Sequence, residues 1–139
     1  MFRSLVSTRH SLVIFASPVA AGFPSPAEDY VEGRLDLNDR LVRRPAATFI
    51  VRAEGESMTG AGILPGDLLI VDRSLEARSG SIVIAVLDGA LTVKRLAGSR
   101  RGWRLEAAHP DYPATAIDGD RECVIWGVVT GAVHEFDRR

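Results

Sequence analysis

The 139-residue sequence has only one cysteine and one lysine. The scarcity of cysteine excludes several classes of protein. A single cysteine, Cys123, excludes an internal disulfide and any multi-cysteine metal or iron–sulfur site. Seventeen basic and 18 acidic residues leave a net charge of −1, so no broad field favours nucleic acid or a membrane surface. No apolar run approaches the ~20 residues that span a bilayer. Metal-binding and phosphate-binding motifs are also missing, so no metal or cofactor is predicted.

The remaining composition is that of an ordinary globular domain, with 46% hydrophobic and 25% charged residues. From Thr48 onward, short segments rich in Val, Ile and Leu are separated by turn residues, which is typical of strands. Asp88-Gly89 between two such segments predicts a two-residue type I′ hairpin. We therefore expect a mostly β fold, an antiparallel β-sandwich or barrel-like domain. The predicted strands are 48–53, 68–72, 81–87, 90–96, 103–107, 114–117 and 123–133.

One or two short helices are expected before the first strand. Ser25, followed by Pro26 and Glu28, matches a capping box, which predicts a helix running to about Glu32. A second helical turn is predicted from Asp36, with Leu37 and Leu41 facing inward.

The first 24 residues differ in composition from the rest. A basic start is followed by the apolar stretch 12–21, with small residues at Val19 and Ala21 before a possible cut, which is the pattern of a secretory signal. Taken alone, this segment leaves secretion open.

Ser57 is the first candidate for chemistry, because it follows a predicted strand within Gly55-Glu56-Ser57-Met58. A serine in such a loop can expose its hydroxyl near converging backbone N–H groups, as a nucleophile requires. The alternative is an ordinary turn serine.

Lys94 is the second candidate. It is the only lysine, and all other basic residues are arginine. Burial would lower the pKa of its ammonium and supply a neutral amine at moderate pH, whereas arginine stays protonated. The alternative is a solvated strand lysine.

The other polar residues form no recognisable site. Histidines at 10, 109 and 134 have no metal spacing and no neighbouring nucleophile. Cys123 opens an apolar strand and is expected to be a small buried side chain. Arginines 43, 44, 100, 101 and 104 are expected to be solvated surface.

The combined pattern resembles the LexA/UmuD family of Ser–Lys self-cleaving peptidases, the S24 type. An upstream stretch narrows the resemblance to the branch that serves as accessory subunit of a translesion polymerase. The segments that carry the resemblance are 55–58, 62–72 and 92–96, with 22–31 and 35–38 upstream.

The resemblance implies roles for individual residues. Ser57 matches the nucleophile, Lys94 the general base, and Ala21-Gly22 the scissile bond. One branch of the family has cysteine before this glycine, whereas this chain has alanine, as the LexA repressors do. The backbone N–H groups of Glu56 and Ser57 are the expected oxyanion hole. Residues 1–21 then form a removable arm and 22–139 the peptidase domain, and the same bond explains the signal-like segment without secretion.

The resemblance also implies a function. It is that of a cytoplasmic SOS DNA-damage-response protein that cleaves itself when stimulated by the RecA–single-stranded DNA filament. The processed homodimer would then join a UmuC-type DNA polymerase. Alternatives are a LexA-like or phage-type autoproteolytic regulator and a catalytically inactive polymerase adaptor. The 21 residues before Gly22 are too few for a helix-turn-helix, so no sequence-specific DNA binding is expected.

Overall fold

A computed structural model describes residues 10–15, 31–117 and 122–139 of the chain. It divides into two compact units, Met1–Arg43 and Arg44–Arg139, which are described separately. Within the described ranges, no helix is both long enough and apolar enough to cross a membrane.

The described part of the first unit consists of a two-stranded sheet and one short helix. Strands β1 (Leu12–Phe15) and β2 (Val31–Leu35) pair antiparallel. Helix α1 (Leu37–Leu41) follows, and Asp36 caps it by accepting a 2.9 Å hydrogen bond from the backbone N–H of Asn38. The helical turn predicted from Asp36 is therefore confirmed.

Two details of the helix predictions are wrong. Val31 and Glu32 lie in β2 rather than in a helix, because pairing with β1 supplies backbone partners that local capping does not. The rest of that predicted helix lies outside the described residues. Leu37 and Leu41 were expected to face inward, yet both are exposed, because the five-residue α1 has no buried face.

The second unit is an open, antiparallel seven-stranded sheet in the order β3-β4-β9-β5-β6-β7-β8. The mostly β, antiparallel prediction is confirmed, and the sheet does not close into a barrel. Two 3-10 turns, η1 (Pro45–Ala47) and η2 (Thr59–Ala61), flank β3. The strands are β3 (Thr48–Arg52), β4 (Leu68–Asp72), β5 (Ile82–Leu87), β6 (Ala90–Ser99), β7 (Gly102–Glu106), β8 (Thr115–Ile117) and β9 (Cys123–Val133).

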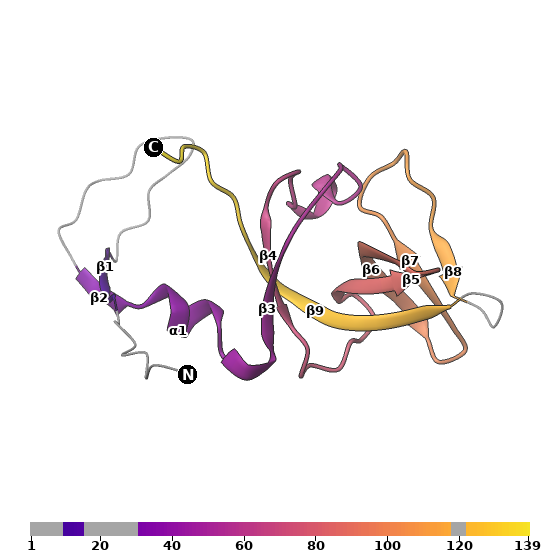
Figure 1. The fold of residues 1–139 in the computed structure, drawn as a ribbon, viewed down its shortest axis with the longest axis horizontal. Helices are drawn as coiled ribbons and strands as arrows, with labels where there is room; N and C mark the ends of the chain where they lie inside the picture. The colour runs from indigo at the N-terminus through magenta and orange to yellow at the C-terminus, as the bar shows by residue number, and fades with distance from the viewer. Residues whose placement is uncertain (1–9, 16–30, 118–121) are drawn as a thin grey trace, which may run out of the picture. The chain divides into compact units, whose positions relative to one another are not determined.

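Strand β9 joins the two halves of this sheet, and Figure 1 shows it running from β5 to β3 and β4. Its first half pairs with β5 and its second half with β4, and Val128 pairs with both Val83 and Asp72. Each pairing contains a register shift, which bends a strand locally. One long strand thereby fixes the position of β4 relative to β5 and β6.

The predicted hairpin at Asp88-Gly89 is confirmed. Leu87 pairs with Ala90 across the two-residue loop. Asp88 has φ +50° and Gly89 has φ +83°, the left-handed backbone that a type I′ turn requires at both positions. This turn sets the register that carries Lys94 opposite Val83.

Both faces of β5 are covered by apolar side chains. Ile84 belongs to one buried cluster with Leu69 and Met58, whereas Val83 and Ala85 belong to a second cluster. Successive side chains of a strand point to opposite faces, so β5 lies between the two clusters. The chain around Ser57 and the chain around Lys94 are thus both anchored in packed core.

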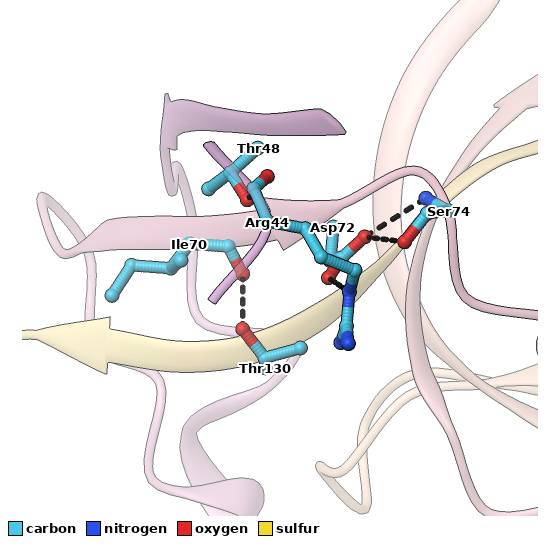
Figure 2. A network of polar contacts seen from close by, with 6 residues as sticks. All are labelled: Arg44, Thr48, Ile70, Asp72, Ser74 and Thr130. Atoms are coloured by element: carbon cyan, nitrogen blue, oxygen red, sulfur yellow. Dashed lines mark hydrogen bonds and ion pairs between the residues drawn. The ribbon is translucent and has the colours of Figure 1, made fainter. Parts of the chain in front are cut away.

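A polar network holds the end of β4, as Figure 2 shows. The carboxylate of Asp72 is buried and accepts hydrogen bonds from the Arg44 guanidinium at 2.6 Å and the Ser74 hydroxyl at 2.6 Å. Hydrogen bonds from Ser74 hold the pKa of Asp72 below its usual value, as does the bond from Arg44, against the opposing effect of burial. The network fixes the chain that enters β3 to the chain that leaves β4.

Candidate active site

The loop that carries Ser57 connects β3 to β4 and is fixed by backbone hydrogen bonds to a distant segment. The N–H of Ala108, beyond β7, donates to the Ser57 carbonyl at 2.8 Å, and the N–H of Gly60 donates to the Ala108 carbonyl at 2.8 Å. A Cβ at position 60 would lie 2.5 Å from that carbonyl oxygen, so only glycine fits there. Ser57 is therefore held in place by its neighbours in the fold as well as by its own loop.

Lys94 reaches this serine from β6. Its ammonium Nζ donates to Ser57 Oγ at 2.9 Å and to the Val93 carbonyl at 3.1 Å. The two side chains, 37 positions apart in sequence, thus lie in direct contact. The geometry is that of a nucleophile and a base within hydrogen-bond reach.

The surroundings of Lys94 favour its neutral form. The side chain is half-buried, and desolvation by burial lowers the pKa of its ammonium from the usual 10.5. Leu96, on the same face of β6, is buried, and Val93, on the other face, packs against the first apolar cluster. Both faces of the strand are therefore partly covered at this point.

An open cleft of about 360 Å³ leads to Ser57 and Lys94. Its walls are the end of β3, the Ser57 loop and the first residues of β6. Most of the lining side chains are apolar, and Arg52 and Glu54 add opposite charges beside Ser57 and Lys94. Such a cleft can admit an extended peptide with small or apolar side chains. The lining residues are Val51, Arg52, Ala53, Glu54, Ser57, Leu69, Ile84, Leu91, Thr92, Val93 and Lys94.

The backbone N–H groups of Glu56 and Ser57 donate no hydrogen bond to another described residue. This leaves two donors beside the hydroxyl, as an oxyanion hole needs. Their role remains a prediction. The scissile bond predicted at Ala21-Gly22 lies outside the described residues.

None of the other candidate residues of the second unit lines the cleft. His10 is exposed, and His109 lies beyond β7 in edge contact with Tyr112. Cys123 is half-buried against the second apolar cluster. Arg104 pairs with Glu106 at 2.6 Å. Arginines 43, 44, 100 and 101 are exposed, and Arg44 also pairs with the carboxylate of Asp72.

Sequence reasoning missed Asp67, which is buried and bonded to His134. The only sequence signal was its place in Pro65-Gly66-Asp67, which indicated a turn and nothing more. The partner, 67 residues further along the chain, is brought to it by the pairing of β4 with β9.

The comparison with known families matches residues 13–130 to the Peptidase S24-like family, and the chain belongs to it. The chain is 49% identical over 121 residues to Protein ImpA of Salmonella typhimurium, covering 87% of this chain and 82% of that protein. It is 44% identical over 137 residues to Protein MucA of Escherichia coli, covering 97% and 93% of the two chains. A LexA repressor of Halorhodospira halophila is 42% identical over 116 residues, which span 83% of this chain and 51% of the repressor.

Proposed function

We propose that this chain is a self-cleaving serine endopeptidase in which Ser57 and Lys94 cut the bond between Ala21 and Gly22. The observation that carries the proposal is the 2.9 Å hydrogen bond from Lys94 Nζ to Ser57 Oγ in an open cleft. Membership of the S24-like family supports the class of reaction.

The chemistry follows from these two side chains. The neutral amine of Lys94 takes the hydroxyl proton as Ser57 Oγ attacks the Ala21 carbonyl carbon. The N–H groups of Glu56 and Ser57 stabilise the oxyanion that forms. Lys94 then gives its proton to the amine of Gly22, which leaves, and water hydrolyses the acyl-enzyme to regenerate Ser57. The burial that lowers the pKa of Lys94 increases the fraction of neutral amine at any given pH, which favours the first proton transfer.

The biological role that we propose is a cytoplasmic one in the SOS response to DNA damage. A RecA–single-stranded DNA filament would stimulate cleavage by binding the cleavable conformation more tightly than the resting one. The processed chain, from Gly22 to Arg139, would act as a UmuD-type homodimeric accessory subunit of a UmuC-type translesion polymerase. The similarity to ImpA and MucA along most of their length supports this branch of the family.

A second candidate is a LexA-like autoproteolytic regulator, supported by the identity to the Halorhodospira repressor. Both candidates share the cleavage reaction and differ in what the product does. Binding of the Gly22–Arg139 product to a UmuC-type polymerase favours the first candidate, and binding of the intact chain to operator DNA favours the second.

The decisive experiment is the amino-terminal sequence and intact mass of the purified chain after incubation with RecA, nucleotide and single-stranded DNA. We expect a fragment that begins at Gly22. A chain that remains intact, with RecA filaments verified to be active on another substrate, would contradict the proposal.

A further inference from the structure

Asp67 is a buried charged residue that the proposed chemistry does not use. Its side chain is 1% exposed, in the turn that precedes β4. Its carboxylate oxygen Oδ2 accepts a 2.8 Å hydrogen bond from the backbone N–H of Leu64. A buried carboxylate is costly unless its oxygens are bonded, so the position of this one demands an explanation.

The hydrogen bonds of Asp67 reach both ends of the loop that carries Ser57. Ala53, where the loop leaves β3, donates its N–H to the Asp67 carbonyl at 2.8 Å. Leu64, where the loop returns, donates its N–H to the Asp67 carboxylate at 2.8 Å. A single residue therefore joins the start and the end of the segment 54–63.

His134 holds the carboxylate from the other side. The register of β4 and β9 pairs Leu68 with Val133, which brings residues 67 and 134 next to each other. There, Nδ1 of His134 bonds to the second carboxylate oxygen, Oδ1, of Asp67. The imidazole is also in edge contact with Phe136. The loop is thereby tied to β9, the strand that also fixes β5 and β6.

We propose that Asp67, oriented by His134, is a positioning residue that holds the Ser57 loop at the distance from Lys94 that cleavage requires. The inference rests on the proposed self-cleavage. Asp67 touches neither Ser57 nor Lys94. Its carboxylate acts through the backbone N–H of Leu64, and an error of about 1 Å at a nucleophile can slow a reaction about 100-fold.

Asp72 provides a matched control within the same strand. It lies at the opposite end of β4, is buried to a similar extent, and is bonded to Arg44 and Ser74 rather than to the Ser57 loop. Removal of either carboxylate leaves its hydrogen-bond donors without this acceptor, so both variants are expected to be less stable. Only the removal of Asp67 should change the geometry at Ser57.

The experiment compares Asp67→Ala, His134→Ala, His134→Asn and Asp72→Ala with the unaltered full-length chain. The measured quantity is the rate of appearance of the Gly22 fragment at alkaline pH, below the melting temperature of each variant. We expect Asp67→Ala to be slower by about tenfold or more and His134→Ala by about threefold to tenfold. His134→Asn keeps an N–H donor near the position of Nδ1 and should restore the rate to within about twofold. Asp72→Ala should also stay within about twofold.

Hydrogen exchange of the Ala53 and Leu64 amides gives a second readout that does not require cleavage. We expect faster exchange at the Leu64 amide in Asp67→Ala and His134→Ala, and unchanged exchange there in Asp72→Ala. The Ala53 amide should change less, because its acceptor is the backbone carbonyl of residue 67. If Asp67→Ala does not fold, the half-exposed His134 still allows the test. Normal cleavage and exchange in the His134→Ala variant, or equal slowing in Asp72→Ala, would overturn the inference. Failure of the proposed self-cleavage can be told apart from failure of this inference. In that case the unaltered chain would not cleave, but the difference in hydrogen exchange between the Asp67 and Asp72 variants would remain.

Discussion

The two units of the chain differ in how far their apolar side chains are buried. Every buried hydrophobic residue among the described positions belongs to the second unit, where two packed clusters cover both faces of β5. Most apolar side chains in the described part of the first unit are exposed, and strand β1 is exposed along its whole length. These exposed residues are Leu12, Val13, Ile14, Phe15, Leu37 and Leu41.

This difference matches what each unit must do in a self-cleaving protein. A catalytic pair needs a rigid frame, and the second unit holds Ser57 and Lys94 by strand pairing, buried core and backbone hydrogen bonds. A segment that must enter a cleft as an extended strand has to rearrange, which costs less where little apolar surface is already buried. Under the proposed self-cleavage, the chemistry would fall to the second unit and the substrate to the first, and the following predictions test that division.

The largest effect is expected from Ser57→Ala, which removes the nucleophile from the second unit and leaves the first unchanged. Cleavage at Ala21-Gly22 should fall below detection, because no other hydroxyl is bonded to Lys94 among the described residues. Mass spectrometry of the chain incubated with RecA filaments measures this loss. Circular dichroism should show an unchanged fold. A Gly22 fragment from this variant would mean that another group performs the attack.

Lys94→Arg is expected to have the next largest effect. Arginine keeps the positive charge but supplies no neutral amine, so the hydroxyl of Ser57 loses its base. Loss of a general base costs about 10²–10⁴ in rate. Quantifying the Gly22 fragment over time gives the rate constant, and Arg95→Lys on the same strand is a control for changes in charge type. Processing of Lys94→Arg at the normal rate would exclude the lysine as base.

A change of pH should alter the cleavage rate less than either substitution, but its effect should report on Lys94 specifically. Burial lowers the pKa of this ammonium from 10.5, so the neutral base accumulates at a lower pH than for an exposed lysine. Below the folded-state pKa the rate should rise about tenfold per pH unit, and it should level off before pH 10.5. In the window between the lowered pKa and 10.5 the unfolded chain binds more protons, so this residue makes stability rise with pH.

Fragment appearance, followed by quenched samples between pH 6 and 11, measures this profile. Unfolding at extreme pH would also change the cleavage rate, so thermal melting at each pH is the control. A flat profile in a chain that stays folded would contradict a lysine base.

Much of the second unit could be predicted from the sequence, because its signals are local. Alternating apolar residues and turn dipeptides predicted all seven strands, and Asp88-Gly89 predicted its turn type correctly. The contact of Lys94 with Ser57 was expected from the family resemblance, and the two side chains do meet. The strand limits differ by a few residues, as in β6, which extends to Ser99.

The features that the sequence did not reveal depend on contacts between distant segments. Asp67 and His134 meet only because β4 pairs with β9, and neither residue has a local pattern that indicates a partner. Val31 and Glu32 follow a good helix-capping signal, yet they pair with β1 because a complementary strand overrides local propensity. Leu37 and Leu41 have helical spacing, but spacing alone cannot supply a surface for them to pack against.

The smallest effect is expected from Phe15→Ala in the first unit. This variant tests most directly whether the two units differ in their contribution to stability. Phe15 is 64% exposed, so its truncation should change the free energy of unfolding of the second unit by less than about 0.5 kcal/mol. Leu69→Ala is the matched change in the core, where Leu69 is 1% exposed, and it should cost about 2–5 kcal/mol. Urea unfolding followed by tryptophan fluorescence measures both, because Trp103 and Trp126 belong to the second unit. If Phe15→Ala destabilised the second unit as much as Leu69→Ala does, the first region would be part of the stable frame, and the division between frame and substrate would be wrong.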